Sequence, residues 1–217
     1  MKKVLVIGAG SFGSTAAVAL AHQNCEVIVI DINAQKLNLV KSEVAQVIVG
    51  DSTNKELLEK FALKMDMVLV SLGEIIDASI LTVLHLKELK IKKIIAKATT
   101  LEQEKVLKLI GAHQIVNPER DEALRLAKQL VSPNILDLMN FTEQLQIVEL
   151  VVPESFFGKT LIELDVRNKY DMQILAVRNP LTNKSVVMPR PDYSFQADDI
   201  IIVIGDTDKI EKLSPKA

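Results

Sequence analysis

The sequence is poor in the features that mark secreted, membrane-spanning or nucleic-acid-binding chains. Cys25 is the only cysteine, so no internal disulfide can form, which suits a reducing compartment such as the cytoplasm. No apolar run approaches the roughly 18 residues of a membrane-spanning helix. The apolar run after Met1 breaks at glycines too soon for a signal peptide. The formal net charge is −2 and no basic run occurs, which disfavours a nucleic-acid partner.

Signatures of common enzymes are also missing. The three histidines, His22, His85 and His113, stand far apart and have no Cys, Asp or Glu partner at the spacing of metal ligands. There is no nucleophile elbow, no P-loop and no H-E-x-x-H motif. A dehydrogenase needs a base and an electrostatic clamp from a substrate domain, and the C-terminal third offers no such set. The sequence therefore argues against an enzyme.

The composition is that of a folded protein. Hydrophobic residues make up 48% of the chain and charged residues 25%, so a substantial core can form and disorder is disfavoured. A length of 217 residues suits one domain of ordinary size followed by a small one.

The N-terminal stretch carries the strongest functional signal. A buried strand is predicted over residues 3–7, followed by Gly8, Gly10 and Gly13 at G-x-G-x-x-G spacing, and then a helix rich in small residues over 14–22. Strand, glycine turn and helix in this order are typical of dinucleotide-binding folds. We expect Gly8 to form the turn, Gly10 to let the backbone approach a phosphate, and Gly13 to let the helix pack closely. The helix N-terminus then attracts an anion.

A second predicted strand, residues 26–30, ends in Asp31, about the expected 20 residues beyond the turn. A carboxylate there can accept a hydrogen bond from a ribose 2′-hydroxyl. Ile32 and Asn33 follow where an NADP-binding site would place an arginine, so NADP is disfavoured. The alternative is a fold of this type whose site holds no nucleotide.

Short apolar strands then alternate with helices. Further strands are predicted over 46–49, 67–70, 93–97 and 114–116, and helices over 33–41, 54–62, 75–89 and 101–110. This alternation predicts an α/β fold with a doubly wound, parallel, Rossmann-type sheet. Ligands of such sheets bind at the carboxyl ends of the strands. The candidate residues for a nucleotide at these ends are Gly8, Gly10, Ser11, Phe12, Gly13, Asp31, Ile32, Asp51, Ser52, Thr53, Ser71, Leu72, Gly73 and Lys97.

Several of these candidates have a structural alternative. Asp51 is a candidate for contact with the base or ribose and equally for the cap of the helix over 54–62, and the two roles are compatible. The segment Ser71–Gly73 either brings backbone close to the ligand or forms a simple turn. Lys97 either meets a phosphate or is a strand-end lysine that reaches solvent. Glu119 is a candidate ligand of a hard cation that also touches phosphate, or else a helix-start carboxylate.

The pattern changes after residue 116. Residues 117–120 are predicted to break the alternation, with helices over 121–130 and 135–139 separated by a break at 132–134. This region is either an arm that packs outside the domain or an ordinary terminal helix. From residue 146 a small α+β module is predicted, with strands over 146–152, 172–178, 185–188 and 199–205 and short helices over 158–166 and 207–213. We therefore expect domains at 1–140, with crossover helices at about 119–139, and at 141–217.

Taken together, these stretches resemble the cytosolic RCK (regulator of potassium conductance) proteins of the Trk/Ktr potassium-uptake type. The resemblance covers nearly the whole chain and depends on the order and spacing of several motifs. The motifs are Gly8–Gly13, Val29–Asp31, Gly50–Thr53, Ala96–Ala98, Gly111–Glu119, Gly158–Arg167 and Asp198–Gly205.

The resemblance implies a non-enzymatic regulatory subunit that binds ATP/ADP or NAD(H). Such proteins form homodimers that assemble into an octameric ring on the cytoplasmic face of the cell membrane, against an integral membrane potassium-translocating subunit. Nucleotide binding changes the ring and so gates transport. The break after Glu119 resembles the crossover that locks two subunits together. Glu119 also matches the position where some Ktr-type members hold Mg²⁺ or another cation near the phosphates.

Two departures from the family pattern matter. Ser11 stands where some Ktr-type members carry an arginine that reaches the terminal phosphate of ATP, which leaves ADP or NAD(H) more open. Lys169–Tyr170 is followed by Asp171 and Met172, whereas members that bind cyclic di-AMP tend to have a glycine and a small polar residue there. The alternatives to the regulatory role are a small NAD-dependent oxidoreductase and a soluble NAD(H) redox sensor without a membrane partner.

Overall fold

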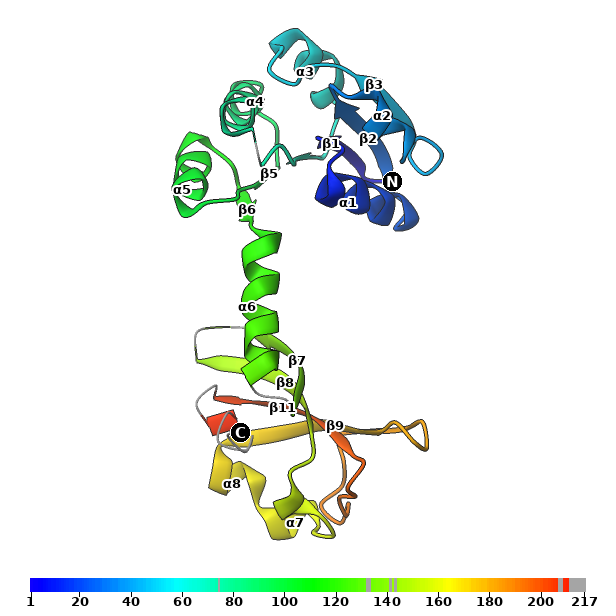
Figure 1. Ribbon diagram of the computed structural model, residues 1–217, viewed down its shortest axis with the longest axis vertical. Helices are drawn as coiled ribbons and strands as arrows, with labels where there is room; N and C mark the ends of the chain where they lie inside the picture. The colour runs from blue at the N-terminus through cyan, green and yellow to red at the C-terminus, as the bar shows by residue number, and fades with distance from the viewer. Residues whose placement is uncertain (74, 132–133, 141, 143, 207–208, 211–217) are drawn as a thin grey trace. The chain divides into compact units, whose positions relative to one another are not determined.

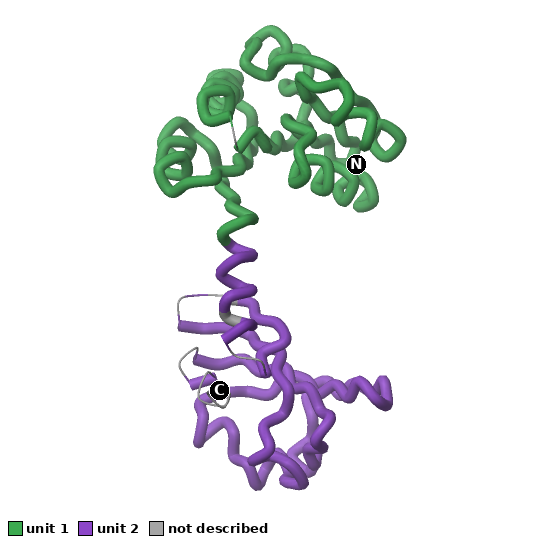
Figure 2. The backbone as a smooth tube through the Cα atoms, in the orientation of Figure 1, with its two compact units in different colours: residues 1–120 green, residues 121–217 purple. Residues whose placement is uncertain are grey.

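The computed structural model describes residues 1–73, 75–131, 134–140, 142, 144–206 and 209–210. The chain divides into two compact units, residues 1–120 and residues 121–217 (Figure 2). Each unit has its own sheet; the first unit has a hydrophobic core on each face of its sheet, and the second unit has one core. Among the described residues, no helix is both long enough and apolar enough to cross a bilayer.

The first unit alternates strands and helices along the chain (Figure 1). Its sheet has the strand order β3-β2-β1-β4-β5-β6, and every pairing is parallel. This confirms the predicted doubly wound sheet, and the strand order reverses between β1 and β4, where such sheets bind ligands. The elements are β1 (Lys3–Ile7), α1 (Ser11–His22), β2 (Glu26–Asp31), α2 (Ala34–Asn38), β3 (Gln46–Val49), α3 (Lys55–Ala62), β4 (Met67–Val70), α4 (Ile76–Glu88), β5 (Ile94–Lys97), α5 (Leu101–Ile110) and β6 (Gln114–Val116).

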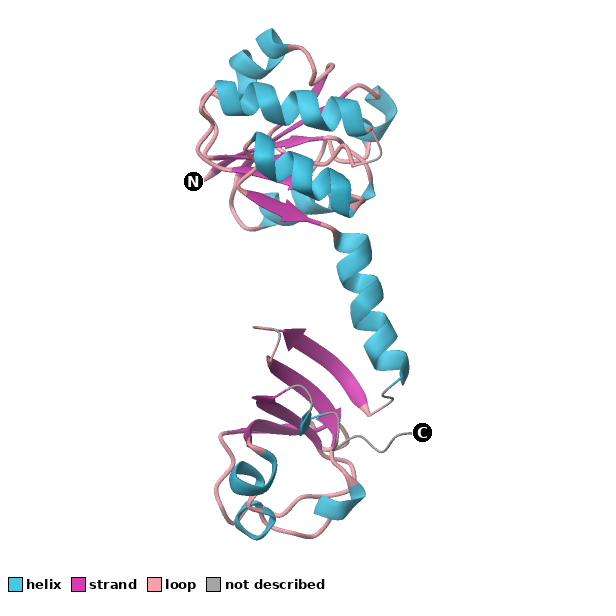
Figure 3. Cartoon of the chain, turned by 90° about the vertical axis from the view of Figure 1, so that its left-hand side faces the viewer, coloured by secondary structure: helices cyan, strands magenta, loops and turns pink. Residues whose placement is uncertain are grey.

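Helices cover both faces of this sheet, which explains why its central strands are apolar on both sides (Figure 3). Successive residues of β1 alternate between the two cores: Leu5 and Ile7 enter one, and Val4 and Val6 enter the other. The first core takes side chains of α3, α4 and α5, and the second takes side chains of α1 and α2. The strands whose carboxyl ends form the candidate site are therefore packed against helices on both faces of the sheet.

Side-chain caps define where several helices begin. Asn33 accepts a hydrogen bond from the backbone N–H of Gln35, Asn54 from Glu56, and Thr100 from Gln103. The helix predicted over 33–41 is shorter than expected, because it ends at Asn38.

The second unit contains a five-stranded antiparallel sheet with the order β10-β9-β11-β8-β7. The fold class predicted for the C-terminal part, a small α+β subdomain, is thereby confirmed. Helix α6 (Pro118–Val131) leads from the first unit into the second. The elements that follow are β7 (Ile135–Asn140), β8 (Leu145–Val151), the 3₁₀ helix η1 (Glu154–Phe156), α7 (Leu161–Leu164), α8 (Val166–Tyr170), β9 (Met172–Asn179), β10 (Lys184–Val187) and β11 (Ile200–Asp206).

The break predicted at residues 117–120 is wrong, because α6 already begins at Pro118. Asn117 accepts a hydrogen bond from the backbone N–H of Arg120 at 3.0 Å, and proline is tolerated at the first helical position because its missing N–H would have no partner there. The break predicted at 132–134 falls mostly on residues 132 and 133, which lie outside the described residues.

The helix predicted over 135–139 is also wrong. This segment is strand β7, which pairs with β8 from Ile135 opposite Leu150 to Asn140 opposite Gln146. Its apolar residues fit either periodicity over so short a run, and pairing with the edge of the sheet decides the outcome. The expected pair of crossover helices at about 119–139 is therefore one helix and one strand. Where the two domains divide as folding units stays a prediction.

Two other predicted helices differ from the structure or fall outside it. The helix predicted over 158–166 begins only at Leu161 and is interrupted at Asp165, which adopts a left-handed conformation with φ 47°. The helix predicted over 207–213 lies outside the described residues except for 209–210.

Candidate nucleotide-binding site

The glycine turn between β1 and α1 is packed so tightly that two of its glycines have no room for a side chain. Gly8 has φ +95°, and a Cβ there would lie 2.5 Å from the carbonyl oxygen of Ser71. A Cβ at Gly13 would overlap the carbonyl oxygen of Gly8. The packing therefore bears out the roles predicted for these glycines within the fold.

Gly10 differs from the other two glycines, because a Cβ there would meet no atom within 4 Å. The protein itself thus gives no steric reason for glycine at this position. Gly10 caps the N-terminus of α1, whose first turn carries no acidic residue. The first N–H groups of a helix have no intrahelical acceptor, so Ser11, Phe12 and Gly13 present backbone donors and a positive dipole end. This geometry suits an anion beside Gly10.

Asp31 lies at the end of β2 and is buried, with 8% of its surface exposed. Its Oδ2 accepts a hydrogen bond from the backbone N–H of Ala9 at 2.6 Å, and its Oδ1 accepts one from Asn33 at 2.7 Å. The carboxylate therefore ties the glycine turn to the end of the neighbouring strand. Each carboxylate oxygen has a second lone pair, so a ribose hydroxyl can still donate to it. Ile32 follows with 70% of its surface exposed.

The polar side chains after β3 form hydrogen bonds to the protein itself rather than pointing into open space. The Asp51 Oδ1 accepts hydrogen bonds from the backbone N–H of Thr53 at 2.9 Å and from its hydroxyl at 2.8 Å. Ser52 is buried, and its hydroxyl lies 3.0 Å from that of Thr82 on α4. The cap of α3 is Asn54 and not Asp51. Asp51 is exposed and remains a candidate ligand contact.

The segment after β4 adjoins the glycine turn. The backbone N–H of Ser71 donates to the Ile7 carbonyl at 2.7 Å, and Leu72 packs against the core. The Gly73 carbonyl accepts from the Thr99 hydroxyl at 3.3 Å. A Cβ at Gly73 would lie 3.0 Å from Thr99 and 3.4 Å from Lys97. The ends of β4 and β5 are thus packed together.

Sequence reasoning missed a residue that stabilises the segments after β4 and β5 by hydrogen bonds. Gln103, which is 3% exposed, accepts hydrogen bonds through its Oε1 from the backbone N–H and the hydroxyl of Thr99. Its backbone N–H donates in turn to Thr100. A Thr followed three residues later by Gln is a capping-box signal, which would have drawn attention to this pair.

Lys97, Glu119 and Phe12 come together although they are far apart in sequence. The Lys97 ammonium group forms an ion pair with the Glu119 carboxylate and lies 5.8 Å from the centroid of the Phe12 ring. The Lys97 side chain is 13% exposed, whereas Glu119 is 64% exposed. The hydrogen bond from Lys97 lowers the pKa of Glu119 below its ordinary value, against the opposing effect of desolvation. The residues predicted to meet phosphate and cation therefore bind each other.

The proposed cation ligand has few acidic neighbours. No group of three or more His, Cys, Asp or Glu side chains suited to a metal ion occurs in the part of the chain that the structure describes. A cation at Glu119 would therefore need ligand oxygens from elsewhere, such as phosphate. That assignment stays a prediction.

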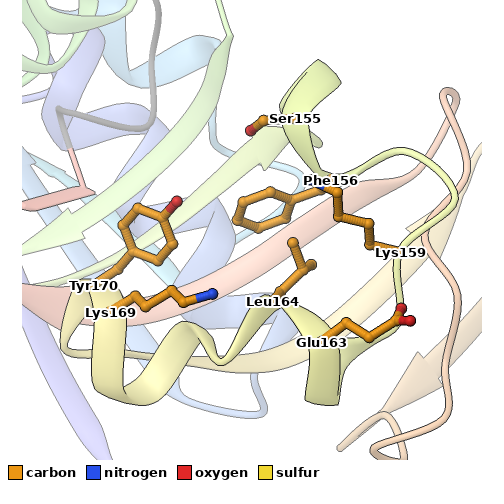
Figure 4. A pocket seen from close by; sticks show the side chains of 7 residues that line it. All are labelled: Ser155, Phe156, Lys159, Glu163, Leu164, Lys169 and Tyr170. Atoms are coloured by element: carbon orange, nitrogen blue, oxygen red, sulfur yellow. The ribbon is translucent and has the colours of Figure 1, made fainter.

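A separate pocket of about 340 Å³ lies within the second unit (Figure 4). Two of the residues that line it, Phe156 and Leu164, are buried. Glu163, one of the lining residues, already forms a capping box with Thr160, so its carboxylate serves the start of α7. The full lining is Ser155, Phe156, Lys159, Glu163, Leu164, Lys169 and Tyr170.

Comparison with known proteins agrees with this two-part architecture. The family model described as TrkA-N domain matches residues 4–118, and the model described as TrkA-C domain matches residues 145–217. Ktr system potassium uptake protein C of Bacillus subtilis (strain 168) is 39% identical over 99% of this chain and 97% of its own. Ktr system potassium uptake protein A of the same organism is 33% identical over 97% and 95%.

Solved structures share the fold. The GsuK channel superposes with a TM-score of 0.69 at 20% identity, over 98% of this chain and 38% of the channel chain. The GsuK channel bound to NAD superposes with a TM-score of 0.65 at 19% identity, over the same shares. This chain therefore spans well under half the length of those chains.

The first sheet, its glycine turn and the C-terminal module define a two-domain protein of the TrkA-N/TrkA-C class. The chain belongs to this RCK family and is homologous to the Ktr system potassium uptake proteins over nearly its whole length. The family resemblance expected from the sequence motifs is thereby confirmed.

Proposed function

We propose that this chain is a nucleotide-binding regulatory subunit of a potassium-uptake system, and that it has no catalytic activity of its own. The observation that carries the proposal is the edge of the first sheet. There the bare N-terminus of α1, an open Gly10 and the buried Asp31 carboxylate lie at the switch between β1 and β4. Such an edge suits a phosphate and a ribose.

The ligand of this edge is an adenine nucleotide, either ATP/ADP or NAD(H). NAD is bound by a channel that shares this fold, and no arginine follows Asp31 to hold the extra phosphate of NADP. Ser11 provides no long cationic side chain for a terminal phosphate. We assign this role to Lys97, whose ammonium group lies 5.8 Å from the centroid of the Phe12 ring in the glycine turn. Asp51, Ser71 and the Gly73 backbone are secondary contacts.

The partner and assembly follow from kinship with the Ktr proteins. Two relatives that are 39% and 33% identical over nearly the whole chain are Ktr system components, which implies an integral membrane subunit that translocates potassium. We propose that the chain lies on the cytoplasmic face of the membrane as homodimers assembled into an octameric ring. A nucleotide can shift such a ring between two states only by the difference of its affinities for them.

The first experiment is isothermal titration of the purified chain with ATP, ADP, NADH and NAD⁺, with and without Mg²⁺. Tight binding of any one of them supports the proposal, and sedimentation then reports whether the protein has the mass of a ring. A Mg²⁺ effect that disappears in Glu119→Gln would assign the cation to that residue. If none of the four nucleotides binds, the glycine turn is structural only and the proposal fails.

The alternative is a small NAD-dependent oxidoreductase or a soluble NAD(H) redox sensor. NADH oxidation on a panel of carbonyl substrates separates the first from a regulator, since a regulator gives no turnover. Copurification with a membrane subunit distinguishes the regulator from the soluble redox sensor, since the sensor has no membrane partner.

A further inference from the structure

The Lys97–Glu119 ion pair couples the nucleotide site to the start of α6. Lys97 lies at the end of β5 and Glu119 in the first turn of α6, the helix that continues into the second unit. Phe12 belongs to the first turn of α1, where the bare N–H groups lie. The Lys97 ammonium group therefore adjoins a residue of each first turn: it pairs with Glu119 of α6 and lies near the Phe12 ring of α1.

This arrangement gives Lys97 two alternative partners. Its four-carbon stem is flexible, and its charge lies 5.8 Å from the Phe12 ring centroid, so a phosphate on the α1 N-terminus is within its reach. A diphosphate carries more negative charge than one carboxylate. Glu119 is largely exposed, so water screens its hold on the lysine. A bound phosphate group therefore has the means to displace the carboxylate.

Resting on the proposed function, we infer that the Glu119 carboxylate competes with a bound phosphate for Lys97. We call this ion pair the lock. In the empty site Glu119 occupies the lysine; a phosphate that arrives on the α1 N-terminus takes the lysine and releases the first turn of α6. The release has a structural consequence because α6 leads directly to β7 and the antiparallel sheet. The lock also selects ligands: only those whose phosphate reaches Lys97 overcome Glu119. The freed carboxylate is then available to a cation held by the same phosphates.

The test compares ADP and adenosine binding in EDTA, by titration calorimetry, for the wild type and four variants. In Glu119→Gln the competitor is gone, so ADP affinity is expected to rise about two- to fivefold, the worth of an exposed ion pair. Adenosine has no phosphate, so its affinity should stay the same. A merely structural role for Glu119 would move both ligands together.

Glu122→Gln is the matched control. It removes the same charge from the same helix, one turn further along, where the carboxylate pairs with Arg125 at 2.6 Å. Its ADP affinity should equal that of the wild type, because the rise expected in Glu119→Gln comes from freeing Lys97 and not from the loss of one negative charge on the helix. The other two variants are Lys97→Met and its combination with Glu119→Gln. The double variant should bind ADP no better than Lys97→Met alone, since the lock acts only through the lysine.

Failure of this inference is distinguishable from failure of the proposed function. If wild type binds ADP and Glu119→Gln binds it equally or more weakly in EDTA, the lock is wrong while the nucleotide site stands. If Glu119→Gln and Glu122→Gln raise the affinity alike, the effect is bulk charge and the lock is again wrong. If the wild type binds no nucleotide at all, the proposed function fails first and the lock fails with it.

Discussion

The two units use their polar groups in opposite ways. At the edge of the first sheet, the α1 N-terminus and Gly10 leave backbone donors and open space. In the second unit the buried Asp199 carboxylate is bonded to its neighbours: Oδ1 accepts from Asn179 at 3.0 Å, and Oδ2 accepts from Tyr193 at 2.9 Å and from the Gln196 backbone at 3.0 Å. The comparison teaches that a buried carboxylate alone does not mark a ligand site; the open donors beside it do.

The largest expected effect breaks the glycine turn itself. In Gly13→Ala the new methyl group overlaps the Gly8 carbonyl oxygen, which is backbone and cannot move aside. We expect a loss of about 3 kcal/mol or more in the free energy of unfolding, enough to prevent stable folding of the first unit. Circular dichroism and urea unfolding measure it.

Gly10→Ala is the matched control for that prediction. A methyl group there meets no protein atom within 4 Å, so stability should change by less than about 0.5 kcal/mol. Affinity for ADP or NADH should nevertheless fall at least tenfold, because the methyl group occupies the space of the phosphate. Equal nucleotide affinity in Gly10→Ala and wild type would show that the open space is not the phosphate site.

The next effect lies in the second unit. In Asp199→Ala the buried amide of Asn179, the Tyr193 hydroxyl and the Gln196 N–H all lose their acceptor. We expect a loss of about 3 kcal/mol in the stability of this unit, because unsatisfied buried donors are costly. Burial and the bond to Asp199 raise the pKa of Tyr193 to about 12, so the variant should also titrate this phenol at lower pH, as ultraviolet difference spectra would show.

Asp198→Ala is the control, since Asp198 is an exposed neighbour. It should leave stability within about 0.5 kcal/mol of the wild type. Nucleotide affinity of the folded protein should be unchanged in both variants, because the Asp199 network is structural. A tenfold loss of affinity in Asp199→Ala alone would overturn the contrast between the two units.

Asp31 combines a structural role, through its hydrogen bonds to the backbone, with a proposed contact to the ligand. Its substitution therefore sharpens the comparison between the two units. In Asp31→Asn one side-chain oxygen is kept and the other becomes an N–H₂ group, so either Ala9 or Asn33 loses its acceptor. We expect a loss of about 2 kcal/mol in stability, since hydrogen bonds to a charged group are worth about 1.5–3 kcal/mol. Nucleotide affinity should fall as well. Thermal unfolding with and without saturating NADH separates the two losses.

The opposite result would be informative. If Asp31→Asn lowers stability while nucleotide affinity is unchanged, Asp31 serves only to hold the turn. The exposed carboxylate Asp51 would then be the next candidate for the ribose.

The sequence predicted the first sheet and its glycine turn because both depend on local signals. Each apolar strand is short, each polar candidate follows directly at a strand end, and the glycines stand at fixed spacing. The strand β7 was missed because five residues rich in Leu and Ile carry too little period to separate strand from helix. Pairing with β8, a contact between segments, decided its structure.

The site could be predicted as a set of residues but not as a set of contacts. Lys97 and Glu119 are 22 residues apart, and they meet only because β5 and β6 are neighbours and α6 begins directly after β6. Ser52 was predicted beside the ligand, yet its hydroxyl bonds to Thr82, 30 residues away, on a helix whose packing no local pattern reveals. Such pairings follow from topology.

The smallest expected effect concerns Asp171, a residue of the second unit whose backbone is left-handed, with φ 56° and ψ 41°. Its carboxylate pairs with Lys209, and that hydrogen bond lowers the pKa of Asp171. Asp171→Gly and Asp171→Ala both remove the ion pair, but only glycine adopts this conformation without strain. The Gly variant should therefore melt about 2–4 °C above the Ala variant.

Lys209→Gln isolates the ion pair in the same experiment, because it removes the partner and leaves the backbone of Asp171 as it is. Both side chains are well exposed, at 44% and 71%, so its melting temperature should lie within about 1 °C of the wild type. The order Gly above Ala, with Lys209→Gln near the wild type, would show that backbone conformation outweighs the charge at this turn. A large loss in Lys209→Gln, with the Gly and Ala variants equal, would mean instead that the ion pair holds the turn. This outcome would show that a lysine–carboxylate contact, rather than backbone conformation, stabilises the end of α8.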